Sequence, residues 1–128
     1  MANVHVVEDD PAYLYLVQRS LKGTGHAITY HTSSYSAWDA VAGGVPIDLL
    51  LTDLRFQHGE PNGLALAFHA RAKNPDIAIL LMTSDDDLLD QMEKDLGAVF
   101  SKSKPLDGLA AAVEERLNSR VTSKAPES

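Results

Sequence analysis

Short apolar runs alternate with longer amphipathic stretches along this chain, and the alternation predicts strands and helices in turn. The apolar runs are rich in β-branched and aliphatic residues, as buried strands are. They cover residues 4–7, 27–31, 47–52, 77–82 and 98–100. The amphipathic stretches cover about residues 11–22, 34–42, 63–73, 85–96 and 106–117. Strands that alternate with helices in this way indicate right-handed βαβ units, and therefore a parallel sheet covered on both faces.

Capping and turn residues mark the boundaries of several elements. Asp10 is a candidate N-cap with Pro11 at the first helical position, and Ser34 or Ser36 can start the second helix. The predicted fold class is α/β, a flavodoxin-like (βα)5 doubly wound sandwich with a parallel five-stranded sheet in the order 2-1-3-4-5. This order reverses between strands 1 and 3, and ligands bind at the carboxyl ends of the strands at such a point.

The composition is typical of a single soluble domain. The 128 residues are 45% hydrophobic and 23% charged, and this length is enough for one domain with a full core. We expect that domain to cover residues 1–119 and the polar residues 120–128 to form a disordered tail. The sequence has no cysteine, no secretory signal and no apolar stretch of membrane-spanning length, which favours a cytoplasmic protein without a membrane partner. The net charge of −7 argues against a nucleic-acid partner.

Acidic residues follow two of the predicted strands, where the sheet order reverses. Glu8 and Asp9 come directly after the first strand, and Asp53 follows the third. Taken alone, the pair could complement a helix dipole and Asp53 could cap a turn. Because the two strands are predicted neighbours, we expect the three carboxylates to meet, and they would repel one another without a cation. Magnesium suits such oxygen ligands, and a carboxylate can also accept a phosphoryl group as a nucleophile.

Two further polar groups lie at the ends of the remaining strands. Thr83 follows the fourth strand, where ordinary β-propensity is an equally good explanation for a threonine. Lys104 precedes Pro105 in a turn after the fifth strand, and its ammonium is a natural counter-ion for carboxylates and phosphate. Lys102 competes for this place, and only the adjacent proline favours Lys104. The five histidines show no spacing typical of metal ligands, and we assign none of them a role.

These motifs, taken in order, resemble the receiver domain of bacterial two-component response regulators. The resemblance covers about residues 3–118. It rests on Val6-Val7-Glu8-Asp9-Asp10-Pro11, Leu51-Thr52-Asp53, Met82-Thr83-Ser84 and Lys104-Pro105. It implies that Asp53 accepts a phosphoryl group from a histidine kinase or a histidine phosphotransfer protein, with Mg²⁺ as cofactor.

The resemblance also implies the roles of the surrounding residues. Asp9 would bind Mg²⁺ directly, Glu8 would bind it through water, and Asp53 and the backbone carbonyl of Arg55 would be further ligands. Thr83 would hydrogen-bond the phosphoryl oxygen, and Lys104 would pair with the phosphoryl group. In this family, that contact shifts an equilibrium between inactive and active arrangements.

The sequence departs from the family pattern at three places. The loop after Asp53 is two residues longer than usual, because the glycine expected eight residues on comes ten residues on, at Gly63. Ser101 stands where the family usually has an aromatic switch residue, three residues before Lys104, with Phe100 beside it. Arg55 is large and charged, at a position that in this family influences the lifetime of the phosphoryl group. We hypothesise that it reaches Asp85 or Glu8 and restricts the attacking water.

Three functions are compatible with these residues. The leading interpretation is a stand-alone receiver, not an enzyme, which signals to an unknown downstream protein through its fourth helix, fifth strand and fifth helix, and which could form a homodimer. The first alternative is a degenerate pseudo-receiver that acts without phosphorylation. The second is a small Mg²⁺-dependent aspartyl-phosphate phosphatase. Such enzymes often place an acid two residues after the nucleophile, where this chain has Arg55.

Overall fold

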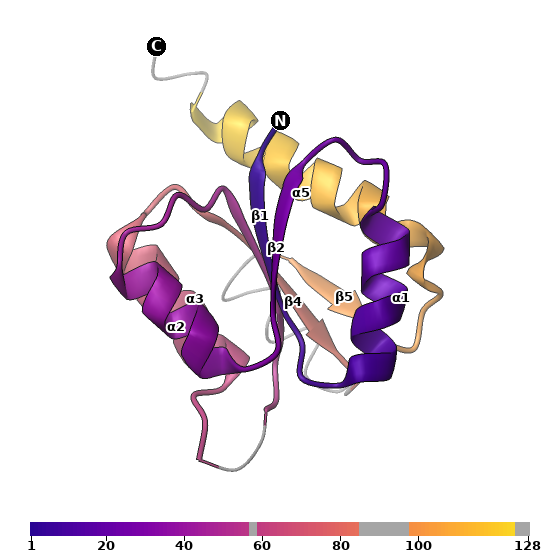
Figure 1. Cartoon of the computed structure of the whole chain (residues 1–128). Helices are drawn as coiled ribbons and strands as arrows, with labels where there is room; N and C mark the ends of the chain where they lie inside the picture. Colours follow the sequence, from indigo (N-terminus) through magenta and orange to yellow (C-terminus); the bar gives the residue numbers. More distant parts are fainter. Residues whose placement is uncertain (57–58, 85–97, 125–128) are drawn as a thin grey trace.

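A five-stranded parallel sheet in the order β2-β1-β3-β4-β5 forms the centre of the molecule, as predicted (Figure 1). The computed structural model of the chain describes residues 1–56, 59–84 and 98–124. The strands are β1 Asn3–Val7, β2 Ala27–His31, β3 Leu49–Asp53, β4 Ala78–Thr83 and β5 Val99–Ser101. The described helices are α1 Pro11–Leu21, α2 Ser34–Ala42, α3 Gly63–Lys73, the short 3₁₀ helix η2 Leu106–Gly108 and α5 Leu109–Lys124. The helix predicted over residues 85–96 lies outside the described residues.

Helices cover both faces of the sheet, with α2 and α3 on one face and α1 and α5 on the other (Figure 1). Successive side chains of a strand point to opposite faces, so β1, β3 and β4 each place buried residues in both cores. Val4 and Val6 of β1 pack with α1 and α5, whereas Val7 packs with α2 and α3. Burial on both faces explains why the strands read as continuous apolar runs.

Side-chain caps begin three of the helices. The Asp10 carboxylate accepts a hydrogen bond from the Ala12 amide at 3.0 Å, which confirms the predicted cap of α1. Ser33 caps α2, so this helix begins at Ser34, the earlier of the two predicted starts. Asn62 caps α3 through a 2.8 Å hydrogen bond from the Ala65 amide. Each cap satisfies a backbone donor that the first helical turn leaves without a partner.

Some element boundaries differ from the predicted ones, and two of the shifts affect the functional end of the sheet. The third strand runs to Asp53 rather than to Thr52, and the fifth runs to Ser101 rather than to Phe100. At the other end of the chain, α5 continues to Lys124, so the predicted domain boundary at residue 119 lies within this helix. Among the described residues, no helix combines the length and apolar character needed to cross a membrane.

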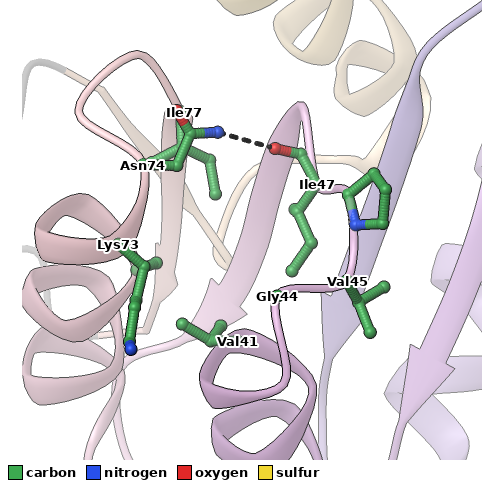
Figure 2. Close-up of a pocket in the computed structure, with 9 residues that line it drawn as sticks. Val41, Gly44, Val45, Ile47, Lys73, Asn74 and Ile77 are labelled. Atoms are coloured by element: carbon green, nitrogen blue, oxygen red, sulfur yellow. Dashed lines mark hydrogen bonds between the residues drawn. The ribbon is translucent and has the colours of Figure 1, made fainter.

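A small pocket lies at the amino-terminal ends of β3 and β4, where Figure 2 shows the end of α2 beside the end of α3. Its volume is about 160 Å³. Val41, Val45, Ile47 and Ile77 line it with apolar side chains (Figure 2). The Asn74 side-chain amide donates to the Ile47 carbonyl at 3.3 Å, which ties the end of α3 to the segment before β3.

Candidate functional site

Three carboxylates meet at the carboxyl ends of β1 and β3, as the sequence predicted. Glu8, Asp9 and Asp53 each offer an oxygen that lies within 4.8 Å of the others. Glu8 is fully buried, whereas Asp9 and Asp53 are partly exposed. Clustered carboxylate oxygens that remain partly open to water suit Mg²⁺, which binds few carboxylates and keeps several waters. The residues present therefore fit a magnesium ion.

Backbone pairing in the sheet brings these acids together. Val7 lies opposite Thr52 in the β1–β3 register, so Glu8, which follows β1, and Asp53, the last residue of β3, lie side by side. The Glu8 amide also donates to the His31 carbonyl at the end of β2, at 3.0 Å. These ladder contacts fix the backbone of the acids before any ligand binds.

Local hydrogen bonds then orient two of the carboxylates. Asp53 Oδ1 accepts from the Leu54 amide at 2.9 Å, and Glu8 Oε2 accepts from the Asp10 amide at 3.1 Å. In each carboxylate, the other oxygen is directed to a single side chain, that of Lys102.

Lys102, and not Lys104, is the lysine at the acidic cluster. Its Nζ lies 2.6 Å from Glu8 Oε1 and 3.1 Å from Asp53 Oδ2. Lys104 is exposed and lines a surface hollow with residues such as Phe100 and Pro105. The placement expected for Lys104 is therefore wrong, and the competitor named in the sequence analysis occupies the position.

The register of β5 explains the correction. Ser101 pairs with Thr83 as the last residue of its strand, so Lys102 is the first residue to leave the sheet at the site. Its amide donates to the Thr83 carbonyl at 2.8 Å, which holds the start of its side chain at the strand end. Lys104 comes later in the turn, where its amide donates back to the Ser101 carbonyl at 3.1 Å. The adjacent proline was a weaker guide than the strand end.

Thr83 ends β4 at the same edge of the sheet and is buried. Its position beside Asp53 follows from the neighbouring register pair, in which Asp53 lies opposite Met82. Thr83 therefore lies at the same strand ends as the acids and Lys102.

The described part of β5 places no aromatic side chain in the usual switch position. Ser101 is buried, and its hydroxyl lies 2.7 Å from that of Ser103. Counting three residues back from Lys102 instead leads to Val99, which is also not aromatic. Phe100 is buried in the core between the sheet and the α1–α5 layer. Coupling of Thr83 to a rotating ring of β5 is thus not available within the described residues.

Burial and charge shift the pKa values of two site residues. Burial raises the pKa of Asp9, and the neighbouring charges of Glu8 and Glu60 raise it further. For Lys102, burial acts to lower the pKa. The hydrogen bonds and charges of Glu8 and Asp53 outweigh that effect and raise it, which keeps the ammonium charged. The acids thus gain from a cation, and Lys102 supplies one positive charge.

The later part of the long loop after Asp53 is held against the start of α2. The Glu60 carboxylate accepts from the amide and the hydroxyl of Ser34, at 2.9 and 3.2 Å, at the start of α2. The Tyr35 hydroxyl donates to the Gly59 carbonyl at 2.5 Å. No local sequence pattern indicated these contacts, because Glu60 and Ser34 are 26 residues apart in the chain.

Gly63 closes this loop against the phosphoacceptor candidate. A Cβ atom at this position would lie 2.0 Å from the Asp53 carbonyl oxygen, so only glycine fits. The Gly63 amide donates to the Leu54 carbonyl at 2.8 Å. The glycine that the sequence analysis noted as displaced is therefore the point where the longer loop rejoins the site.

Arg55 lies at the beginning of this loop, two residues after Asp53, and is exposed. Its backbone carbonyl as a metal ligand stays a prediction. Asp85, one of the two acids proposed to meet its guanidinium, lies outside the described residues. The two oxygens of Glu8, the other acid, accept hydrogen bonds from Lys102 and from the Asp10 amide.

Fold and site together define a class of protein, a doubly wound α/β domain with an acidic cation site and a lysine at its strand ends. Within this class, the chain belongs to the family of response regulator receiver domains, whose pattern matches residues 4–114. The resemblance stated from the motifs is thereby confirmed.

Named relatives of this chain are also regulatory proteins. The chain is 35% identical over 119 residues to the transcriptional regulatory protein FixJ of Azorhizobium caulinodans, a match that covers 89% of this chain and 54% of FixJ. It is 32% identical over 118 residues to ZraR of Escherichia coli, covering 90% of this chain and 26% of ZraR. The chain thus spans about half or less of the length of these relatives.

Solved structures show the same fold. A response regulator receiver protein from Sinorhizobium medicae superposes with a TM-score of 0.80 at 24% identity, over 93% of this chain and 96% of that one. The receiver domain of nitrogen regulatory protein C superposes with a TM-score of 0.74 at 28% identity, over 92% and 95% of the two chains. The predicted fold class is confirmed by these likenesses and by the strand order.

Proposed function

We propose that this domain accepts a phosphoryl group on Asp53 from the phosphohistidine of a histidine kinase or a phosphotransfer protein. The observation that carries the proposal is the placement of Lys102 Nζ, which lies 3.1 Å from Asp53 Oδ2 within an acidic cluster that fits a cation. A carboxylate held beside both a cation site and an ammonium can receive a phosphate, because both neutralise the charge that arrives.

A Mg²⁺ ion would be held by Asp9, Asp53 and the backbone carbonyl of Arg55, with Glu8 acting through water. When bound, it would supply positive charge to the phosphoryl oxygens. The residues of the chain supply position. Lys102 pairs with the phosphoryl group, and the Thr83 hydroxyl donates a hydrogen bond to a phosphoryl oxygen.

The transfer itself forms one bond and breaks another. An Asp53 carboxylate oxygen attacks the phosphorus, the new O–P bond forms, and the P–N bond to the donor imidazole breaks. The electron pair of that bond leaves with the imidazole. The product is an acyl phosphate on Asp53, which is later hydrolysed to restore the carboxylate.

Incubation with acetyl phosphate and Mg²⁺, followed by intact mass measurement, tests the proposal. We expect one phosphoryl adduct in the wild-type protein, no adduct in Asp53→Asn, and no adduct when the metal is chelated. Catalytic release of phosphate from many esters would instead favour the phosphatase. The absence of any adduct would favour the pseudo-receiver, an alternative supported by the longer loop and the non-aromatic Ser101 position.

The second part of the proposal concerns the output. We propose that the phosphorylated domain, acting as a stand-alone receiver in the cytoplasm, binds a downstream protein through β5, α5 and the predicted fourth helix, which lies outside the described residues. Output through an attached domain is the alternative, because the relatives are longer than this chain and are named transcriptional regulators. Phosphorylation-dependent binding of a separate protein by this chain would support the stand-alone receiver over output through an attached domain.

A further inference from the structure

One aromatic residue of α1 lies at the functional site, although no motif assigned it a role. Tyr13 belongs to the first turns of this helix, close behind the acidic pair Glu8-Asp9. Lys102 Nζ lies 4.3 Å from the centre of its ring. That distance is well inside the range in which the negative face of an aromatic ring attracts a cation.

We infer that Tyr13 positions the site lysine, an inference that rests on the proposed phosphoryl chemistry at Asp53. Three groups surround the ammonium: the Glu8 carboxylate, the Asp53 carboxylate and the Tyr13 ring. The two carboxylates both take part in the metal and phosphoryl chemistry. The ring is uncharged and takes no part in that chemistry, so its hold on Lys102 persists when the carboxylates change partners.

A lysine needs such support more than an arginine would. Its side chain is long and flexible, and its ammonium is a point charge without a fixed direction of hydrogen bonding. Holding it in one place costs conformational entropy. The attraction between the ammonium and a ring beneath it offsets that cost and keeps the charge near Asp53. The side chain of Lys102 is mostly shielded from water, which strengthens the attraction to the ring.

The electrostatic surroundings of Tyr13 place it in the same cluster. Burial raises the pKa of the Tyr13 phenol, the charge of Lys102 lowers it, and the charges of Glu8 and Asp53 raise it. The phenol oxygen is buried and has no hydrogen-bond partner among the described residues. A buried hydroxyl without a partner costs free energy and does not stabilise the fold, so the ring is the part of this residue that acts on Lys102.

The fold explains how a residue of α1 reaches a lysine after β5. Helices α1 and α5 cover the same face of the sheet (Figure 1), and α1 also contacts η2, the 3₁₀ helix that follows the turn after Lys102. The Ser20 hydroxyl of α1 donates to the Leu106 carbonyl at 3.3 Å, which ties α1 to the segment that follows Lys102. Tyr13 lies in the first turns of the same helix, where its ring contacts Lys102.

Three variants test the inference. Tyr13→Phe keeps the ring, and Tyr13→Leu removes it but leaves an apolar side chain. Tyr15→Leu makes the same change on the exposed side of α1, where the ring contacts Arg19 at 5.9 Å, away from the site. The rate of adduct formation with acetyl phosphate and Mg²⁺ should fall about 3- to 10-fold in Tyr13→Leu and remain unchanged in the other two.

An NMR measurement separates this inference from the proposed function. The ring should shift the signals of the Lys102 side chain upfield in the wild-type protein and in Tyr13→Phe, and the shift should disappear in Tyr13→Leu. This readout does not require phosphorylation, so it holds even if Asp53 accepts no phosphate. A Lys102 spectrum unchanged in Tyr13→Leu would overturn the inference. So would a loss of rate in Tyr13→Phe as large as in Tyr13→Leu, because the hydroxyl would then carry the effect.

Discussion

The two ends of the sheet have opposite characters. The carboxyl ends of the strands gather Glu8, Asp9, Asp53 and Lys102, which are charged and held by hydrogen bonds. The amino-terminal ends of β3 and β4 instead border the pocket of Figure 2, which has apolar walls and one hydrogen bond from Asn74 to the Ile47 carbonyl. β3, for example, begins beside this pocket and ends at Asp53.

The difference shows how one sheet separates stability from chemistry. At the apolar end, side chains close the gap between α2 and α3, and a change there alters packing. At the charged end, carboxylates are kept close together although they repel one another, which favours a cation and a phosphoryl group over the empty site. Substitutions at the two ends should therefore affect different measurements.

The largest expected effect comes from the site lysine. Lys102→Ala removes the ammonium beside Asp53, and we expect adduct formation with acetyl phosphate to slow by about 100-fold, as when one stabilising donor is lost from a transition state. Lys104→Ala is the matched control and should leave the rate unchanged. The reverse result, with Lys104 essential and Lys102 dispensable, would contradict the structural assignment.

A substitution at Gly63 should lower both the stability of the fold and the rate of phosphorylation of Asp53. Gly63→Ala places a Cβ atom against the Asp53 carbonyl, and we expect the free energy of unfolding in urea to fall by about 2–3 kcal/mol because backbone must move. Adduct formation should slow as well, since Asp53 is displaced. Gly108→Ala serves as the control, because a Cβ at that position meets no atom within 4 Å. Equal stability of the two variants would refute the tight contact.

The apolar end should affect stability alone. Asn74→Ala removes the hydrogen bond to the Ile47 carbonyl and another in which the Asn74 side-chain oxygen accepts from the Asp76 amide at 3.2 Å. We expect a loss of about 1 kcal/mol in the free energy of unfolding, with the rate of adduct formation unchanged. A slower rate in this variant would show that the two ends are coupled.

The smallest expected effect is that of Asp9→Asn on the free energy of unfolding, and its sign should differ with and without Mg²⁺. Because burial and the charge of Glu8 raise the pKa of Asp9, its ionised form destabilises the metal-free fold. Asp9→Asn should therefore be more stable than the wild-type protein at neutral pH, by up to about 1 kcal/mol. This advantage should shrink as the pH falls through the raised pKa towards the ordinary value of 3.8, because the wild-type carboxyl then binds its proton in the folded state.

Saturating Mg²⁺ should reverse the order, because the ion binds the folded wild-type protein and stabilises it by mass action. Thermal unfolding of both proteins, with and without Mg²⁺ and over a range of pH, measures the effect. A variant less stable than the wild-type protein in the absence of metal would show that repulsion among the carboxylates is not significant.

The sequence by itself determined the strand order and the acidic part of the site. Apolar runs set the strands, and in a parallel sheet of this order their carboxyl ends place Glu8 and Asp9 beside Asp53. The cap at Asp10 was equally readable, because its hydrogen bond lies within three residues of sequence. These features depend on periodicity and on local contacts, which a sequence records directly.

Only the tertiary structure decided which lysine reaches Asp53, that Tyr13 lies beneath it, and that Gly63 touches the Asp53 backbone. Each of these contacts joins segments far apart in the chain. Each also depends on where a strand ends to within one residue, since the end of β5 at Ser101 makes Lys102 the first side chain at the site. Hydrophobic patterns do not fix strand ends that closely, because one more residue in a buried run barely changes the pattern. Pairing with the neighbouring strand fixes them.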